Sequence, residues 1–178
     1  MLTIKHYARP QTVPEALRLL REKKSNVALG GMLWLKLQDK TVDTAVDLAG
    51  LGLDAIEETP EGWRIGAMVT LRRLETHTGL AAFTGGAMAE SVKHIVGVQF
   101  RNLATIGGSV FGRFGFSDPL TLLLALDARV ELAEAGRMSL KDFAASGIRK
   151  DILTHIFIPG GKVEAAYLSQ RNSATDFP

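Results

Sequence analysis

The sequence predicts a mixed α+β protein made of two lobes. Strand-like and helix-like segments follow one another without the strict alternation that a doubly wound sheet requires. A hairpin signal, with turn formers over residues 60–62 flanked by β-type residues, would open the second lobe. A glycine pair stands in each half of the chain, at Gly30-Gly31 and at Gly107-Gly108. We therefore expect an α/β lobe over residues 1–53 and an α+β lobe over residues 54–168.

Composition narrows the class of protein. A hydrophobic content of 46 % with 22 % charged residues over 178 residues is ordinary for a folded chain with a core. The net charge of +2 and the scattered basic residues argue against nucleic-acid binding. Because cysteine is absent, any iron–sulfur cluster or thiolate-bound zinc would have to sit on a partner. There is neither a signal-peptide pattern nor an apolar run long enough to cross a bilayer, which favours a cytoplasmic protein.

The first lobe reads as strand, helix, strand and glycine turn. Thr3–Tyr7 is a short strand, and Thr12 is an N-cap for a helix that ends near Lys24. The segment Asn26–Leu29 predicts a buried strand that enters the Gly30-Gly31 pair, and the apolar patch behind the glycines predicts a further helix. A third strand is expected over Thr44–Leu48.

The second lobe begins with the hairpin over residues 55–68. Thr70 is expected to cap a short helix, and apolar residues at helical spacing predict another helix over Gly86–Val96. A buried helix should start at Ser117 or Asp118, because Pro119 follows at the first helical position. The remaining expected elements are a strand at residues 129–133, a capped helix at 139–145, and strands at 151–158 and 163–168.

The glycine pairs carry the candidate chemistry. Glycine lets a backbone approach a ligand closely, and neighbouring amides and hydroxyls can hold an anion without a charged side chain. A lone Gly-Gly pair is more often a simple turn. Two such turns from different lobes could clasp a diphosphate between them. Neither turn has the P-loop pattern or the spaced glycines of the dinucleotide fingerprint.

Longer strings around these turns resemble a known family. The string Gln99-Phe-Arg-Asn-Leu-Ala-Thr-Ile-Gly-Gly-Ser-Val, followed by Ser117-Asp-Pro-Leu, closely resembles the flavin-binding subunit of the molybdenum hydroxylases, the xanthine dehydrogenase and carbon monoxide dehydrogenase group. Shorter similarities begin at Val27, Val46, Trp63 and Asp151, so the resemblance covers nearly the whole chain in order.

The resemblance implies a two-lobed FAD-binding fold of the PCMH (vanillyl-alcohol-oxidase-like) type, with flavin adenine dinucleotide (FAD) between the lobes. The backbone of the first turn would hold the diphosphate through Val27, Ala28, Leu29, Gly30, Gly31, Met32, Leu33 and Trp34. A second cradle would consist of Thr105, Ile106, Gly107, Gly108 and Ser109. Asp118 would accept hydrogen bonds from ribityl or ribose hydroxyls, and apolar contacts to the cofactor would come from Ile95 and Leu153.

The resemblance also implies partners. Electrons would arrive from an iron–sulfur subunit beside a molybdopterin subunit, pass through FAD, and leave to an acceptor such as NAD, so no side chain is assigned a catalytic role. Three features depart from the family pattern. Met32 and Leu33 replace a polar pair, the usual lysine near the last strand is replaced around Leu168, and residues 169–178 are expected to be the start of a C-terminal domain that is missing. Alternatives are a flavin-less scaffold of the same complex and a stand-alone flavin reductase.

Other residues have simpler interpretations. Asp118 could serve only as a helix cap, worth about 1 kcal/mol. Arg101 is expected to solvate its loop, since no carboxylate partner can be identified from the sequence. Trp34 and Trp63 are expected in the core. The four histidines are too scattered for a metal site, and no serine has the context of a hydrolase nucleophile.

Overall fold

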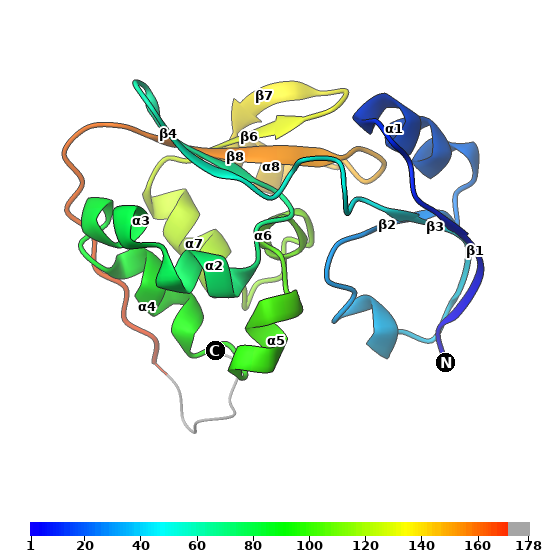
Figure 1. The fold of residues 1–178 in the computed structure, drawn as a ribbon, viewed down its shortest axis with the longest axis horizontal. Helices are drawn as coiled ribbons and strands as arrows, with labels where there is room; N and C mark the ends of the chain where they lie inside the picture. The colour runs from blue at the N-terminus through cyan, green and yellow to red at the C-terminus, as the bar shows by residue number, and fades with distance from the viewer. Residues whose placement is uncertain (171–178) are drawn as a thin grey trace.

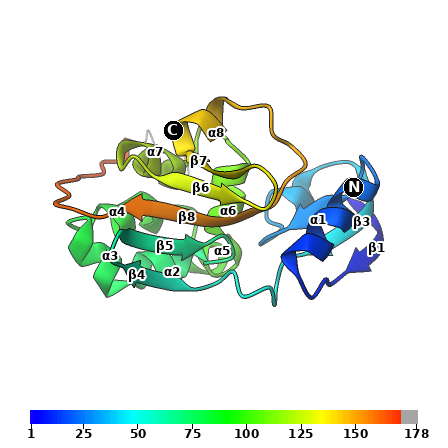
Figure 2. The ribbon, with the colours of Figure 1, turned by 90° about the horizontal axis from the view of Figure 1, so that it is seen from above.

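The computed structural model describes residues 1–170 and contains two sheets, each with its own helices (Figures 1 and 2). The three-stranded sheet is parallel, and the five-stranded sheet is antiparallel. This mixed architecture agrees with the α+β prediction. The lobe limits at residues 53 and 54 stay a prediction, and most of the expected C-terminal extension, residues 171–178, lies outside the described residues.

The first lobe is built on a parallel sheet with strand order β1-β3-β2. Helix α1 covers one face of this sheet. Its Ala16 and Leu20 belong to the same hydrophobic cluster as Val46 in β3 and Leu48 just after it. Thr12 caps this helix as predicted, its Oγ1 accepting a hydrogen bond from the Glu15 amide at 3.3 Å. The elements of the lobe are β1 (Thr3–Ala8), α1 (Val13–Glu22), β2 (Val27–Leu29), the 3₁₀ helix η1 (Leu35–Leu37) and β3 (Thr41–Asp47).

The second lobe is an antiparallel sheet with strand order β4-β5-β8-β6-β7. Figure 1 shows helices gathered on one face of this sheet, and the main hydrophobic cluster lies between the two layers. The strands are β4 (Ile56–Thr59), β5 (Gly62–Gly66), β6 (Arg129–Leu132), β7 (Gly136–Ser139) and β8 (Leu153–Pro159). The helices are α2 (Leu71–Thr76), α3 (Thr78–Phe83), α4 (Ala87–Lys93), α5 (Val98–Leu103), α6 (Ile106–Phe111), α7 (Asp118–Ala125) and α8 (Leu140–Ala145).

Three predicted elements differ from the structure. The helix expected after Gly31 is reduced to the short η1, because Met32 takes a left-handed conformation with φ of 61° that interrupts helical geometry. The helix expected to reach Val96 ends at Lys93, and Val96 is also left-handed with φ of 49°. The strand predicted over Val163–Leu168 is absent from the described segment, which follows β8 as irregular chain past α3 and α4 (Figure 1).

The long glycine-rich stretch before Asp118 is more helical than its sequence predicts. It forms the two short helices α5 and α6, joined at Ala104 and Thr105. The Thr105 hydroxyl caps α6 by accepting a hydrogen bond from the Gly108 amide at 3.2 Å. Helix α3 and strand β7 also lack a sequence prediction, because each is short and is stabilised by tertiary packing rather than by a periodic pattern. Within residues 1–170, none of the helices combines the length and apolar character needed to cross a bilayer.

Candidate functional site

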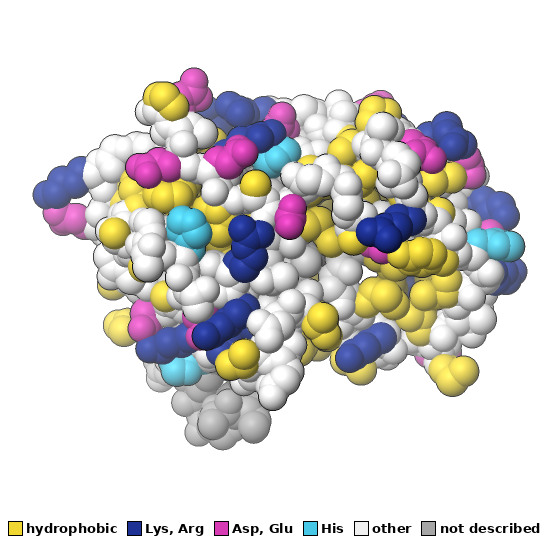
Figure 3. All heavy atoms as spheres, viewed as in Figure 1, with side chains coloured by type: hydrophobic (Ala, Val, Ile, Leu, Met, Phe, Trp, Pro, Cys, Tyr) yellow, Lys and Arg dark blue, Asp and Glu magenta, His cyan; other side chains and the backbone are white. Residues whose placement is uncertain are grey.

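A cavity of about 470 Å³ lies between the two lobes. Its walls are formed by segments that connect the strands of the two sheets. They include the loop after β2, helices α5 and α6, and the segment before β8. Figure 3 shows the surface hollowed in this region, with hydrophobic side chains around the hollow. The size is that of a site for a cofactor or other small ligand.

The structure brings nearly all the predicted site residues to this cavity. From the first lobe these are the eight residues from Val27 to Trp34, and from the second lobe Ile95, Thr105, Gly107, Gly108, Ser109, Asp118 and Leu153. Ile106 differs, because its side chain is buried in the core and the residue is absent from the cavity wall. The ligand contacts of these residues stay a prediction.

The two glycine turns pack directly against each other. A methyl group added at Gly31 would lie 1.9 Å from the Leu103 carbonyl oxygen, and one added at Gly30 would lie 2.6 Å from Thr105 Oγ1. At Gly31 the nearest atoms belong to the backbone, so a side chain there would require backbone movement, whereas at Gly30 the nearest atom is a side-chain hydroxyl. Gly31 is therefore required for packing between the lobes, a role that the sequence alone did not predict.

The first turn holds a run of backbone amides beside the cavity. Within residues 1–170, the backbone amides of Gly30, Gly31, Met32 and Leu33 donate to no protein acceptor. The left-handed conformation of Met32 alters the direction of the chain within this run, and successive amides in such conformations form concave anion sites. These four amides, beside the cavity, are suited to bind an anionic group.

The second turn uses its amides within the protein. Ile106 and Gly107 donate to the carbonyl oxygens of Val69 and Ala67 at 2.9 and 2.8 Å. Gly108 donates to the Thr105 hydroxyl, and Ser109 donates to the Thr105 carbonyl oxygen at 3.2 Å. The predicted cradle of bare amides is therefore not present here in the form expected. What this turn offers to the cavity is a close-packed backbone and two hydroxyl groups, those of Thr105 and Ser109.

Asp118 has a different local role from the helix cap considered for it. The cap position of α7 is Ser117, and Asp118 is the first helical residue, 6 % exposed and on the cavity wall. Its Oδ1 accepts a hydrogen bond from the Tyr167 hydroxyl at 2.6 Å, which ties the segment after β8 to the start of α7. The role of Asp118 toward a sugar hydroxyl stays a prediction.

Positively charged side chains outnumber unpaired negative ones around the cavity. Lys24 and Arg149 line it and form no ion pair within the described chain. Lys150 donates to the carbonyl oxygens of Leu20, Lys23 and Asn26, and burial lowers the pKa of its ammonium group. The carboxylate of Asp151 accepts three backbone amides, at 2.7 to 3.1 Å. The local potential therefore favours an anionic ligand.

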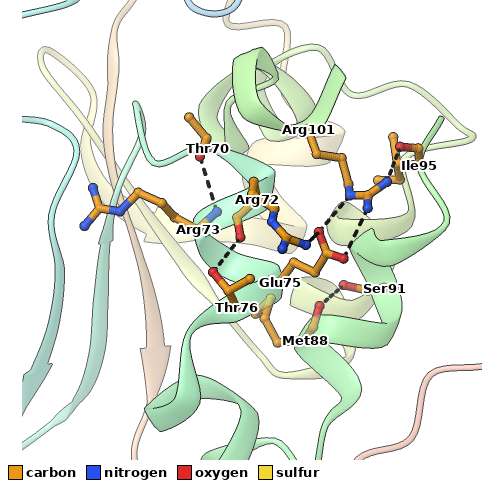
Figure 4. Close-up of polar contacts among 9 residues, drawn as sticks. All are labelled: Thr70, Arg72, Arg73, Glu75, Thr76, Met88, Ser91, Ile95 and Arg101. Carbon is orange, nitrogen blue, oxygen red and sulfur yellow. Dashed lines mark hydrogen bonds and ion pairs between the residues drawn. The ribbon is translucent and has the colours of Figure 1, made fainter. Parts of the chain in front are cut away.

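Arg101 has the carboxylate partner that could not be identified from the sequence. Its guanidinium is buried and donates to both oxygens of Glu75, Nε to Oε2 at 2.8 Å and Nη2 to Oε1 at 3.1 Å, and to the Ile95 carbonyl oxygen at 3.1 Å (Figure 4). Arg72 also pairs with Glu75, at 2.9 Å. Partial burial raises the pKa of the Glu75 carboxyl, but the hydrogen bonds from the two arginines outweigh this and leave the pKa lowered. This cluster anchors α5 to α2. Helix α5 in turn packs against the first turn, where Leu103 lies next to Gly31.

Four aromatic side chains form one wall of the cavity and lie outside the sequence predictions as a group. We call Trp34, Phe100, Phe114 and Phe116 the aromatic wall. Trp34 is half-buried and belongs to this wall rather than to the core, whereas Trp63 is 6 % exposed in the core as predicted. Their separation in sequence conceals the group, because only the contact between the lobes brings Trp34 to the other three.

Comparisons with known proteins agree with this geometry. Residues 2–161 match the family model described as the FAD-binding domain in molybdopterin dehydrogenase. The chain is 32 % identical over 158 residues to YgfM of Escherichia coli K12, covering 87 % of this chain and 59 % of that protein. It is 28 % identical over 166 residues to the medium subunit of nicotine 6-hydroxylase from Paenarthrobacter nicotinovorans, covering 86 % and 58 %.

A solved structure shows the same fold. A chain of reconstituted CO dehydrogenase from Oligotropha carboxidovorans superposes with a TM-score of 0.84 at 25 % identity, covering 98 % of this chain and 66 % of that one. The present chain thus spans about three fifths of the length of the curated relatives described. From the match over residues 2–161, the chain belongs to the FAD-binding domain family of the molybdopterin dehydrogenases, whose cofactor is FAD.

Proposed function

We propose that the cavity between the lobes binds FAD, with the diphosphate at the first glycine turn. The observation that carries this proposal is the run of four amides from Gly30 to Leu33 that the described protein leaves without acceptors. A diphosphate is the part of FAD that needs such donors. The substitution of a polar pair by Met32 and Leu33 does not remove these donors, because they belong to the backbone.

Other features of the cavity fit the same ligand. Lys24 and Arg149 add positive charge, and apolar residues on the walls would exclude water from a bound ring system. The hydroxyls of Thr105 and Ser109 provide further polar groups on the cavity wall. The chain's contribution is therefore to bind, orient and shield the cofactor, while FAD, when bound, supplies the capacity to accept and pass on electrons.

We propose further that the chain acts as the flavin-binding part of an oxidoreductase complex. Its partners would be an iron–sulfur subunit and a molybdopterin subunit, with an electron acceptor such as NAD, in the cytoplasm. The lack of cysteine supports a separate iron–sulfur partner, because this chain provides no thiolate ligand. The relative from Paenarthrobacter nicotinovorans is named as the medium subunit of nicotine 6-hydroxylase, so it is one subunit of an enzyme. This supports a similar role for the present chain.

The purified protein tests FAD binding directly. We expect a yellow protein with flavin absorbance at about 450 nm, which releases FAD on denaturation. A protein that is colourless and cannot be reconstituted with FAD would support the flavin-less scaffold instead. Oxidation of NADH by the isolated chain would support the third alternative, a stand-alone flavin reductase.

A further inference from the structure

The two lobes also meet outside the glycine turns, at Lys150 in the segment before β8. Its Nζ donates to the carbonyl oxygen of Asn26 at 2.6 Å and to those of Leu20 and Lys23 at 3.3 Å. Arg21 of α1 donates in return, from Nε to the Lys150 carbonyl oxygen at 2.9 Å. Figure 1 shows α1 beside the chain that enters β8. We call the contacts of Lys150 and Arg21 the lysine joint.

The lysine joint completes the C-terminal end of α1. The last carbonyl groups of a helix have no amide partner within it and carry partial negative charge, so a cation there is favourable. The Leu19 carbonyl accepts from Asn26 Nδ2 at 2.7 Å within the first lobe, whereas the Leu20 carbonyl accepts from an ammonium group of the second lobe. The three N–H donors of Lys150 match three carbonyl oxygens, and Lys150 forms no ion pair within residues 1–170.

The second lobe holds the chain on both sides of Lys150 in place. The buried carboxylate of Asp151 accepts two amides of the turn between β6 and β7, at 3.1 and 2.9 Å. Arg113 donates to the carbonyl oxygens of Ser146, at 3.0 Å, and of Ile148. The side chain of Lys150 therefore extends toward α1 from a fixed backbone.

An apolar contact lies next to the lysine joint. Ile152 of the second lobe is 1 % exposed and belongs to the hydrophobic cluster of the first lobe, with Ala16 and Leu20 of α1. Hydrophobic contact depends on the area removed from water and has no preferred direction, whereas a hydrogen bond weakens steeply when its angle is wrong. The two residues are therefore suited to different roles: Ile152 holds the lobes together, and Lys150 fixes the angle between them.

The angle between the lobes matters because the cavity lies between them. Asn26 directly precedes β2, and β2 leads into Gly30 at the cavity. The lysine joint thus holds the entry to the first glycine turn in a set position relative to the second lobe. Because the protein uses all three Nζ donors, Lys150 acts on the cavity through α1 and β2 and not as a ligand contact.

We propose that Lys150 is a positioning residue, whose ammonium group sets the angle between the two lobes and so the shape of the cavity. This angle is set in the free protein, before any ligand binds. The consequence for FAD affinity rests on the proposed function.

The angle can be measured as a distance between two spin labels, one in each lobe. The chain has no cysteine, so Arg18→Cys in α1 and Lys141→Cys in α8 provide two specific labelling sites at exposed positions. In this labelled parent, Lys150→Met keeps the length of the side chain and removes its donors. We expect double electron–electron resonance to give a broader distance distribution than in the parent. Lys150→Arg keeps a charged donor and should recover most of the narrow distribution.

Two further variants separate orientation from stability. Ile152→Ala removes a buried apolar contact and should lower the midpoint of thermal unfolding by roughly 5 to 20 °C, while Lys150→Met should lower it by less than half as much. Lys162→Met is the matched control, because Lys162 is exposed and forms an exposed ion pair with Glu164. Its midpoint and its distance distribution should match those of the parent.

Three results would overturn the proposal. They are an unchanged distance distribution in Lys150→Met, equal broadening in Lys150→Met and Lys150→Arg, and a loss of stability in Lys150→Met as large as that in Ile152→Ala. If Lys150→Met does not fold, Arg21→Met is the variant to measure, because it removes the returning donor from an exposed position. An unchanged distribution in Arg21→Met would then overturn the proposal.

FAD affinity of the unlabelled variants gives the second readout. Lys150→Met should weaken FAD binding roughly tenfold in isothermal titration calorimetry, because losing one hydrogen bond from a charged group would lower the population of the correct lobe angle by about that factor. Lys162→Met should bind FAD within about twofold of the wild type. If the wild type binds no FAD, the proposed function is wrong, and the distance measurement still tests Lys150. If Lys150→Met broadens the distance distribution yet binds FAD as the wild type does, the lysine joint does not shape the site.

Discussion

The two glycine turns have the same Gly-Gly pair and lie against each other, yet their backbones do different things. In the first turn the amides of Gly30 to Leu33 have no acceptor in the described protein, and the glycines are closed in by Leu103 and Thr105. In the second turn every amide from Ile106 to Ser109 has an acceptor. A Gly-Gly turn can therefore pack tightly and still leave its amide donors for a ligand, as the first turn does, or use those donors within the protein, as the second turn does.

The largest effect is expected from closing the space between the turns. Gly31→Ala would place a methyl group 1.9 Å from the Leu103 carbonyl oxygen, and backbone cannot move aside easily. We expect a loss of about 3 kcal/mol in the free energy of unfolding, as for severe overpacking, together with loss of FAD binding. Chemical denaturation and FAD titration measure both.

Gly108→Ala is the matched control in the second turn. Its added methyl group would lie 3.3 Å from Thr105 Oγ1, a contact that a small shift relieves, and the position is exposed. The change in unfolding free energy should stay below about 1 kcal/mol. Equal damage from the two alanines would contradict the difference drawn between the turns.

The next largest loss of stability is expected from breaking the buried ion pair between Glu75 and Arg101. Glu75→Ala leaves the buried Arg101 guanidinium without its carboxylate, and α5, which meets Gly31 at Leu103, loses its anchor to α2. We expect the free energy of unfolding to fall by about 3 kcal/mol. The control Glu57→Ala breaks an exposed pair with Arg64 and should cost less than about 1 kcal/mol. Similar losses in the two variants would rule out a supporting role for the buried cluster.

The same cluster predicts a pH dependence. Because the folded-state pKa of Glu75 is lowered, its contribution to stability is present above the unfolded value of about 4.3 and is lost as the pH falls through the folded pKa. The free energy of unfolding should therefore fall on acidification below about pH 4.3, and Glu75→Gln should make that fall shallower. Urea denaturation at a series of pH values measures it. An unchanged slope in the variant would show that Glu75 does not titrate as assigned.

The smallest effect is expected at the cap of the second turn. Thr105→Val removes the hydroxyl that accepts from the Gly108 amide and should cost about 1 kcal/mol. Thr105→Ser keeps the hydroxyl and should recover most of the loss. Thermal denaturation of the two variants distinguishes a capping hydroxyl from simple packing, since both remove part of the threonine side chain.

Much of the fold follows from local signals that the sequence carries openly. Thr12 and Thr70 cap helices where predicted, Pro119 stands in the first turn of α7, and the hairpin turns at residues 60–61. The two glycine turns were also identified, and both lie on one cavity. These features depend on neighbouring residues, so a pattern in the chain is sufficient to predict them.

The remaining features depend on residues far apart in sequence. Arg101 meets Glu75 across 26 positions, and Trp34 meets the phenylalanines only because the lobes are in contact. The left-handed Met32 interrupts the helix expected after Gly31, although methionine itself favours helix. Tertiary contacts likewise decide whether a backbone amide has a hydrogen-bond acceptor. The amide of Gly107, for example, donates to the carbonyl oxygen of Ala67, 40 positions earlier in the chain. Sequence patterns carry no record of these.

We propose that the first turn, and not the second, offers its amides to FAD. Backbone hydrogen exchange measured by NMR with and without FAD tests it at each residue. We expect the amides of Gly30, Gly31, Met32 and Leu33 to exchange rapidly in the free protein and to become at least about tenfold more protected with FAD, while those of Gly107 and Ser109 are protected in both states. Binding of FAD with no added protection at Gly30–Leu33 would show that the first turn does not hold the diphosphate.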